Sequence, residues 1–319
     1  MKIKARVYCD GAHHDTSEID ISPIQLTSLQ KFKYGYLKNE VNFLNIFQKK
    51  HRVPDVLRYV IKVFNNKVTV LKFVEQRLES SSYNDYLAEE GRKENPQHSI
   101  LLVLESPHKD EYYYDEQNHL LIPKSPAQGA TGRNIEKCLR HVLEEIANSY
   151  GLDDGCYHLI IVEPIPYMCS LGFFNPEKKL NEDIRNRVWK AIWSVSEIKN
   201  DFVNRCRKYN PKYIINACTD YNDDGGTLAE IIREVLVNNF SDKELYESPH
   251  PSSHWWCKKK IWKIQQINGH TTYIKKQDEK YVGGFEKPPK YLKKATKDNY
   301  EELLDYLTSN STANIDARD

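Results

Sequence analysis

The pattern of apolar and polar positions predicts four short strands that each run into polar residues. Residues 100–104 form a continuous apolar run, shorter apolar runs occur at 159–162 and 213–215, and a fourth, shorter strand is expected at 244–247. Such runs are typical of strands covered on both faces in a parallel sheet. Ligands of open α/β sheets bind beyond the carboxyl ends of the strands, so the polar residues after these runs are expected to form one site.

Apolar residues at helical intervals predict helices between and after these strands. The predicted helices lie at residues 133–150, 181–199, 201–208, 227–239 and 253–267. Thr131 is expected to cap the first of them. Strands that alternate with helices imply right-handed crossovers. The expected fold is therefore α/β, a three-layer α/β/α sandwich with a mostly parallel four-stranded sheet.

Three regions are expected along the chain. Residues 1–95 show helical spacing at 54–64 and 67–79, which predicts a mainly helical N-terminal addition. Residues 96–275 are expected to form the α/β/α domain. Residues 276–319 are expected to be a basic extension with a short helix and a disordered tail.

Composition indicates a soluble globular protein. The chain has 319 residues, of which 39% are hydrophobic and 29% charged, and its formal net charge is +1. No apolar run approaches the ~20 residues that span a bilayer, and the first residues lack a signal-peptide stretch. We therefore expect a cytoplasmic monomer without membrane contact.

The cysteine and histidine pattern predicts no metal or cofactor. Seven cysteines occur without a C-x-x-C pair, so mostly buried thiols are expected rather than a disulfide framework or zinc site. His250 and His254 are four residues apart, but Pro251 disfavours the regular helix that would bring both to one metal ion. Remote candidates for a metal site are Cys9, His13 and His14.

Five motifs occur in order between residues 98 and 267. They are Leu104-Glu105-Ser106-Pro107-His108 with Asp110 and Glu111 after it, the Pro/Gly-rich segment 126–135, the strand 159–166, the segment 210–215, and His250-Pro251-Ser252. Their order and spacing resemble the uracil-DNA glycosylase superfamily, and more closely the branch whose first motif reads Gly-Glu-Ala-Pro-Gly. The resemblance implies hydrolysis of the N-glycosidic bond of a base flipped out of double-stranded DNA. The cysteine ligands that some relatives use for an iron-sulfur cluster are not recognisable.

Three positions depart from the family pattern. The water-activating Asp of the best-known branch would fall at Ser106, the uracil-reading Asn at Glu163, and the base-stacking aromatic at Ala127. A carboxylate accepts from the amino group of cytosine but is repelled by O4 of uracil, and a small residue at 127 opens volume for a C5 substituent. These departures and the resemblance favour glucosylated hydroxymethylcytosine in phage DNA, hence an antiviral glycosylase. Uracil excision in repair and a non-catalytic reader of modified DNA are the alternatives.

Breaking the glycosidic bond develops positive charge on the sugar and negative charge on the base. Glu105 is expected to orient water and offset the sugar charge, and His250 to donate to the base, with Ser106 as the third catalytic candidate. Alternatively, Glu105 is a helix cap or ion-pair member, His250 a hydrogen-bonded loop histidine, and Glu163 the partner of an arginine. The base-binding candidates are Pro107, His108, Ala127, Thr131, Glu163 and Ser252.

Basic and aromatic residues follow the last motif and predict a DNA-binding segment. The DNA-binding candidates are Arg133, Ser253, His254, Trp255, Lys258 and Lys259. Trp255 is the candidate wedge that would enter the base stack during extrusion. The alternative is an amphipathic helix with buried tryptophans and a solvated lysine face. Similarly, the tyrosine run 112–114 either stacks on bases or packs its own loop.

Overall fold

The computed structural model describes residues 2–20, 47–78, 98–115, 117, 120–169, 178–219, 226–253, 256–258, 261–267, 270–277 and 280–285. Four parallel strands lie at the centre of a mixed α/β fold: β7 (His98–Val103), β10 (Gly155–Val162), β11 (Pro211–Asn216) and β12 (Glu244–Glu247). β7 pairs with both β10 and β11, and β11 pairs with β12. The prediction of a mainly parallel central sheet is confirmed.

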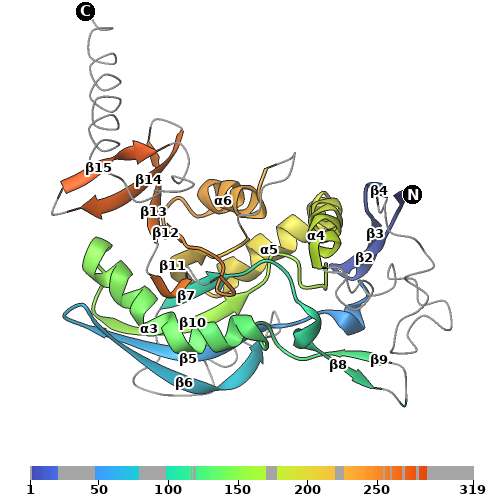
Figure 1. Ribbon diagram of the computed structural model, residues 1–319, viewed down its shortest axis with the longest axis horizontal. Helices are drawn as coiled ribbons and strands as arrows, with labels where there is room; N and C mark the ends of the chain where they lie inside the picture. Colours follow the sequence, from blue (N-terminus) through green and yellow to red (C-terminus); the bar gives the residue numbers. More distant parts are fainter. Residues whose placement is uncertain are drawn as a thin grey trace, which may run out of the picture.

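Antiparallel strands extend this sheet on both sides (Figure 1). They are β5 (Asp55–Phe64) and β6 (Lys67–Leu78) beside β10, and β13 (Trp262–Ile267), β14 (His270–Gln277) and β15 (Lys280–Phe285) beside β12. The described sheet has nine strands in the order β15-β14-β13-β12-β11-β7-β10-β5-β6, rather than the four predicted. One sheet thus continues across the predicted boundaries at residues 95 and 275.

The predicted N-terminal helices are wrong, because residues 55–78 form the β5–β6 hairpin. The turn residues Asn65 and Asn66 have φ values of 49° and 60°. Two consecutive residues with positive φ define the turn that best matches the twist of a two-stranded hairpin, and asparagine tolerates that conformation. The apolar residues of β5 then pack in the core, with Val56 and Ile61 fully buried. Strand pairing therefore overrides the apparent helical spacing.

The described helices agree with four of the five predicted ones. They are α3 (Ala130–Tyr150), α4 (Lys178–Trp193), α5 (Ser196–Lys208) and α6 (Leu228–Asn239). The helix predicted at 253–267 is wrong, since that range holds the short helix η4 (Trp256–Lys258) and strand β13. Thr131 lies inside α3 and does not cap it, because Gly129 occupies the N-cap position. No described helix is both long and apolar enough to cross a bilayer.

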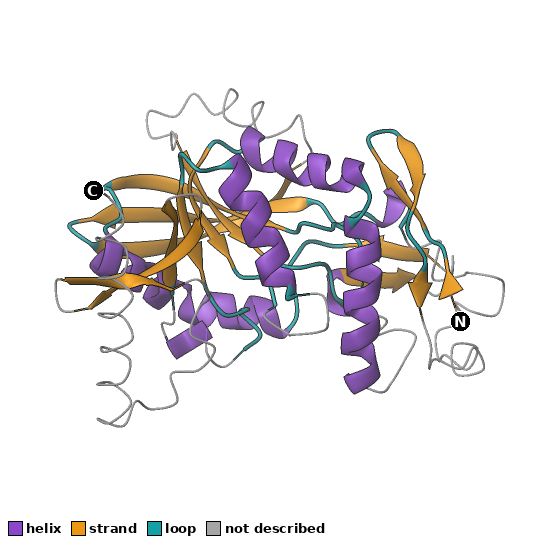
Figure 2. Ribbon diagram, turned by 90° about the horizontal axis from the view of Figure 1, so that it is seen from above, coloured by secondary structure: helices purple, strands orange, loops and turns teal. Residues whose placement is uncertain are grey.

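Alternate residues of β7 enter two hydrophobic clusters. Leu101 and Val103 pack in a cluster with residues of α4, α5 and α6, whereas Ile100 and Leu102 pack in a cluster with residues of α3. Successive side chains of a strand point to opposite faces, so α3 covers one face of the sheet and the other three helices cover the other. Figure 2 shows helices lying across the strands.

Smaller elements complete the described chain. Three two-stranded sheets pair β1 (Lys2–Ile3) with β4 (Ile19–Asp20), β2 (Arg6–Cys9) with β3 (Ala12–Asp15), and β8 (Tyr112–Asp115) with β9 (Leu120–Pro123). Two further short helices are η2 (Lys49–His51) and η3 (Lys109–Glu111). The predicted C-terminal helix and tail fall outside the described residues, which end at 285.

One disulfide joins Cys138 of α3 to Cys257 of η4. The sequence analysis did not predict this bond, because the two cysteines are 119 residues apart and no spacing rule links them. The other five cysteines form no disulfide in the described structure, and Cys156 alone among them is partly exposed. The disulfide ties the segment after the His250 motif to the helix that covers one face of the sheet.

We expect the disulfide to stabilise the protein by about 3–5 kcal/mol, because closing so long a loop restricts the unfolded chain. Urea unfolding of the wild type should therefore show a lower unfolding free energy after reduction. Cys138→Ser and Cys257→Ser should remove this response to reductant, whereas Cys156→Ser should retain it. An equal response in all four proteins would contradict a stabilising bond.

Candidate active site

The exits of the parallel strands bring the predicted catalytic and base-binding residues to one edge of the sheet. Glu105 follows β7, Glu163 follows β10 and His250 follows β12. Glu105 and Glu163 are buried, while Ser106 and His250 are partly exposed. The charge of Glu105 acts on the titration of both Glu163 and His250, so these groups lie near one another.

Glu105 forms an ion pair with Arg185 of α4, at 3.1 Å between Oε1 and Nε. The backbone of Glu105 is also fixed, since its carbonyl accepts a hydrogen bond from Trp189 Nε1 at 3.1 Å. The Arg185 guanidinium donates further to Asn186 Oδ1 at 3.0 Å and 3.2 Å. The alternative interpretation of Glu105 as an ion-pair member is thus correct. The pair also fixes the direction of the carboxylate.

Arg185 is the main site residue that the sequence analysis missed. Its charge acts on both His108 and His250, as does that of Glu105. Arg185 has no fixed spacing from the other motifs, because it comes from a helix that packs across the strand exits. A basic residue within a predicted amphipathic helix carries no signal that would separate it from a surface cation.

Two buried contacts shape the loop after β7. Cys169 and Ser106 are joined by a side-chain hydrogen bond. Glu111 accepts from the backbone N–H groups of His108 at 2.7 Å and Gln128 at 2.8 Å. Burial raises the pKa of Glu111, and these two hydrogen bonds act in the opposite direction. Glu111 therefore links the first motif to the second.

His250 has its ring orientation set by Ser252. The Ser252 backbone N–H donates to Nδ1 of His250 at 3.2 Å, and the Ser252 hydroxyl lies 2.7 Å from the same atom. Since a backbone N–H can only donate, Nδ1 is an acceptor and the proton of the neutral ring is on Nε2. Burial lowers the pKa of His250 to about 4, with Arg185 acting in the same direction and Glu105 against it. His250 is therefore a neutral Nε2–H donor at physiological pH.

Asn134 is a second residue that the sequence analysis did not assign. Its side-chain Nδ2 donates to the carbonyl of Pro251 at 2.8 Å, which holds the His250 loop against α3. Asn134 lies within the predicted motif at 126–135, but only the folded chain shows which segment it contacts. The amide therefore positions His250 from a distance in sequence.

Glu163 is a buried carboxyl group, and in the described part of the chain its side chain forms no ion pair. Among the described residues, its Oε2 has no hydrogen-bond partner. Arg205 does not pair with this side chain, but donates through Nη2 to the Glu163 carbonyl at 2.9 Å. Burial raises the pKa of Glu163 well above its usual value; Glu111, Asp55 and Glu105 raise it further, and Arg205 opposes them. Burial thus favours the protonated form of Glu163, and Arg205 does not form with its side chain the ion pair that the sequence suggested as an alternative.

Arg205 is occupied by other acids. Its Nη1 lies 2.7 Å from both carboxylate oxygens of Asp55, and its Nε lies 2.8 Å from Asp201 Oδ2. Tyr209 also donates to Asp55 Oδ2 at 2.7 Å. Because these partners use the guanidinium, Arg205 acts on the Glu163 side chain only as a nearby charge and not as an ion-pair partner.

Ala127 packs in the core and does not open volume toward a base. Its side chain is 3% exposed and lies in the cluster that contains residues of α3. The Ala127 backbone has φ of +56°, and its carbonyl accepts from Arg58 Nη1 at 3.0 Å. A side chain at Gly132 would collide with this carbonyl. The expected cavity beside residue 127 is therefore replaced by a packed loop.

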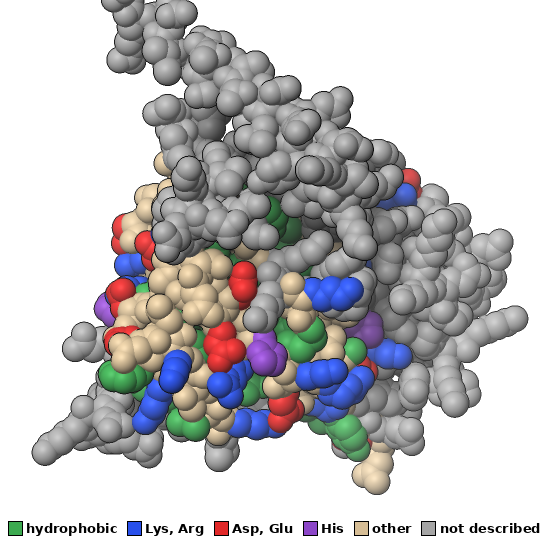
Figure 3. Space-filling view, turned by 60° about the vertical axis from the view of Figure 1, so that its left-hand side comes forward, with side chains coloured by type: hydrophobic (Ala, Val, Ile, Leu, Met, Phe, Trp, Pro, Cys, Tyr) green, Lys and Arg blue, Asp and Glu red, His purple; other side chains and the backbone are tan. Residues whose placement is uncertain are grey.

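The remaining candidates lie on three segments. Pro107 is buried and His108 exposed at the start of η3, Thr131 and Arg133 lie in the first turns of α3, and Ser252 and Ser253 lie in the His250 loop. Lys258 is exposed in η4, whereas His254, Trp255 and Lys259 fall outside the described residues. On the face seen in Figure 3, basic side chains lie among acidic ones and form no dense patch of one sign.

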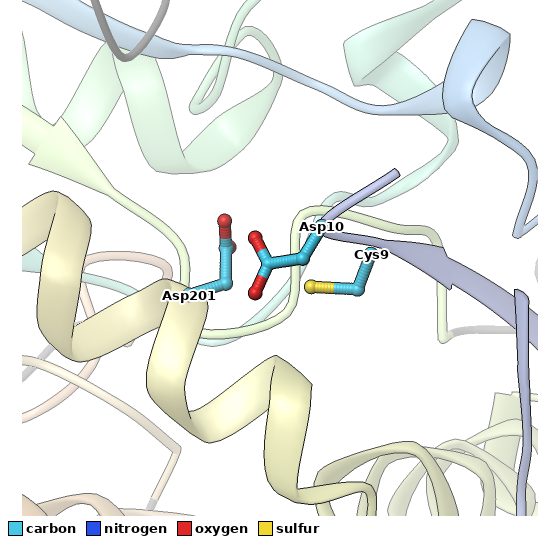
Figure 4. A group of neighbouring side chains, drawn as sticks. All are labelled: Cys9, Asp10 and Asp201. Carbon is cyan, nitrogen blue, oxygen red and sulfur yellow. The ribbon is translucent and has the colours of Figure 1, made fainter. Parts of the chain in front are cut away.

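One group with metal-ligand chemistry lies elsewhere. Cys9, Asp10 and Asp201 point toward one another from β2, the residue after it, and α5 (Figure 4). Asp201 is bound by Arg205 and by Arg52, whose Nη2 lies 3.0 Å and 2.8 Å from its two oxygens. The Cys9 thiol donates to the Glu197 carbonyl at 3.4 Å, and burial raises its pKa to about 12. The group fits a thiol beside a salt bridge better than a metal site.

Comparisons of the chain with protein-family models, with curated proteins and with solved structures found no match. The geometry of the strand exits therefore carries the functional argument.

The neutral state of Glu163 predicts a pH-dependent difference between Glu163→Gln and the wild type. Above about pH 4.5, the unfolded chain loses the Glu163 proton while the folded protein keeps it. Wild-type stability then falls with rising pH, by up to about 1.4 kcal/mol per pH unit, until the folded-state pKa is reached. Glutamine does not titrate. In urea unfolding, the unfolding free energy of the Glu163→Gln variant should therefore rise relative to that of the wild type as pH rises.

Glu144→Gln provides a control of opposite sign. A hydrogen bond from Arg140 lowers the pKa of Glu144, so its contribution to stability is present at neutral pH and lost in acid. The Glu144→Gln protein should therefore lose stability relative to the wild type as pH rises. A stability difference for Glu163→Gln that stays constant from pH 4 to 8 would show that Glu163 is not held neutral.

Proposed function

We propose that this protein is a DNA glycosylase that hydrolyses the N-glycosidic bond of a modified pyrimidine. The observation that carries the proposal is the convergence of Glu105, Ser106 and His250 at the exits of parallel strands, with Arg185 beside them. The order of the motifs along the chain and the helices that cover the parallel sheet also support the proposal. For the fold, the proposal implies a three-layer α/β/α sandwich of the glycosylase kind.

In the proposed reaction, the partly exposed Ser106 hydroxyl and the Glu105 carboxylate face the sugar of the flipped nucleotide. Glu105 orients the attacking water and offsets the positive charge that develops on the sugar. Its ion pair with Arg185 fixes the carboxylate before the substrate arrives, so little reorganisation is needed. Ser106 lacks the charge of an aspartate, which leaves Glu105 as the acid directly at the exit of β7.

His250 is proposed to stabilise the departing base. Its Nε2–H would donate to the base oxygen as negative charge develops there, while Ser252 and Asn134 hold the ring and the loop. A neutral imidazole is suited to this task, because it donates without a stable charge that would bind the ground state equally well. The products are the free base and an abasic site.

We propose a bulky C5-modified cytosine, such as glucosylated hydroxymethylcytosine in phage DNA, as the substrate, and antiviral defence as the role. Support comes from the absence of an asparagine at position 163. A neutral Glu163 offers one donor and one acceptor, which fit N3 and the amino group of cytosine. The same pair also fits O4 and N3–H of uracil, so uracil excision is the second candidate.

The first test compares excision with binding. Glu105→Gln and His250→Ala should each lower single-turnover excision on the order of a hundredfold or more, because they remove charge stabilisation made only in the transition state. Affinity for the same duplex, measured by fluorescence anisotropy, should change less than about threefold. Glu136→Gln and His13→Ala, which alter exposed residues away from the strand exits, serve as controls.

The assay uses duplexes that carry uracil, hydroxymethylcytosine or its glucosylated form, and detects abasic sites by alkaline cleavage. Equal losses of rate and affinity would contradict the catalytic assignment. Wild-type binding without abasic sites would identify a non-catalytic reader of modified DNA. A protein that neither binds nor excises a base from any of these duplexes would contradict the proposal.

The second test concerns the base preference. The Glu163 proton can donate to N3 of cytosine or to O4 of uracil, so its loss as pH rises through the raised pKa of Glu163 should slow excision of both bases. Glu163→Asn should remove this pH dependence and lower the ratio of excision rates for modified cytosine over uracil at least tenfold, or ~1.4 kcal/mol. A variant that keeps both the pH dependence and the ratio of the wild type would exclude Glu163 as a base contact.

A further inference from the structure

The β8–β9 hairpin is the direct continuation of two loops of the candidate site. It leaves the first motif after η3 and returns to the second motif at Lys124. The hairpin is a separate two-stranded sheet, and Figure 1 shows it projecting from the body of the molecule, away from the nine-stranded sheet. A nucleic acid that reaches Glu105 therefore passes close to this projection.

The hairpin has one buried face and one exposed apolar face. Tyr112 and Leu121 are 4% and 5% exposed and belong to a hydrophobic cluster of the core. Tyr113 and Ile122 are 57% and 41% exposed. These two residues are direct cross-strand partners, so their side chains lie together on the outer face.

The base of the hairpin is held firmly. Tyr112 donates through its hydroxyl to the His51 carbonyl at 3.1 Å and accepts from the Met168 N–H at 3.1 Å. The Lys124 N–H donates to the Glu111 carbonyl at 2.8 Å. Glu111 in turn binds the two site loops through its carboxylate. The exposed pair is therefore presented on a rigid support.

The exposed area of Tyr113 and Ile122 distinguishes a protein partner from a nucleic acid. Tyr113 and Ile122 together expose on the order of 200 Å², whereas a stable protein interface buries about 800 Å² on each partner. An aromatic and an aliphatic side chain suffice, however, to cover the face of one base pair. The pair is thus too small for a protein interface but matches one step of a base stack.

The charges at the hairpin base favour a polyanion. Lys109 is exposed and Lys124 partly exposed. The Asp110 side chain lies against Gly129 at the N-terminus of α3, where the helix dipole offsets its charge, and its carbonyl accepts from Lys124 Nζ at 3.3 Å. Asp115 lies two residues after Tyr113 on β8 and therefore shares its face. Lys109 and Lys124 are the cations that can meet phosphates, at the base of the hairpin.

From this geometry we propose that Tyr113 and Ile122 form a DNA contact that stacks on the base pair next to the extruded nucleotide. The proposal rests on the proposed glycosylase function and adds a wedge separate from the candidate Trp255. In a duplex, the pair replaces the stacking lost when the base leaves. In a single strand, no such gap has to be filled.

The test measures DNA affinity and therefore does not depend on catalysis. The probes are a fluorescein-labelled duplex with one tetrahydrofuran abasic site and the corresponding single strand. The double variant Tyr113→Ala/Ile122→Ala should bind the duplex about tenfold more weakly, or ~1.4 kcal/mol, and the single strand less than about threefold more weakly. Tyr113→Phe, which keeps the ring, should bind the duplex like the wild type.

Phe64→Ala/Leu71→Ala is the matched control, because these residues are 69% and 45% exposed on a different hairpin, β5–β6. It should leave both affinities unchanged. The proposed contact would be overturned, with the glycosylase function unaffected, if the Tyr113→Ala/Ile122→Ala variant bound the duplex as tightly as the wild type. It would also be overturned if the control variant lost as much duplex affinity as the Tyr113→Ala/Ile122→Ala variant. A wild type that binds neither probe and excises no base would overturn both. Loss of self-association in the variant, with DNA affinity unchanged, would assign the pair to a protein partner.

Discussion

The buried guanidinium of Arg205 is the contact on which the site depends most. It joins Asp55 of β5 to Asp201 of α5 and holds the backbone carbonyl that follows β10. Removing these charges from water is costly, and the pairing is tolerated only because each guanidinium nitrogen has an acceptor. Loss of either acid would leave a buried charge unpaired. The network therefore fixes how the antiparallel β5 lies beside the parallel centre of the sheet.

The same network sets the chemistry of the strand exits. Because Arg205 is used by other acids, burial raises the pKa of Glu163 and favours its protonated form, whereas Glu105 has Arg185 within ion-pair distance. Two buried carboxyl groups in one site thus have opposite electrostatic surroundings. Such a difference is the usual basis for dividing acid and base roles between residues of the same type. In the proposed glycosylase reaction, this difference would give charge stabilisation to Glu105 and donor-acceptor recognition to Glu163.

The sequence predicted what local patterns determine. Three of the four central strands, β7, β10 and β11, contain apolar runs, so their position and the polar residues at their exits could be foreseen. The β5–β6 hairpin was missed because its apolar residues also fit a helical period, and the signal of Asn65 and Asn66 was weaker than that spacing. Arg185 and Asn134 could not be foreseen, since each acts on a motif far away in the chain. The neutrality of Glu163 likewise depends on burial and on where Arg205 is used.

Glu111 extends this coupling from the site to its surroundings. One carboxylate accepts from the loops of the first and second motifs, and the carbonyl of the same residue accepts from the return strand of the β8–β9 hairpin. The hairpin and the catalytic loop are therefore parts of one rigid unit. Binding energy gained at Tyr113 would then not be spent on ordering the loop that carries Glu105, and it remains available to position the nucleotide.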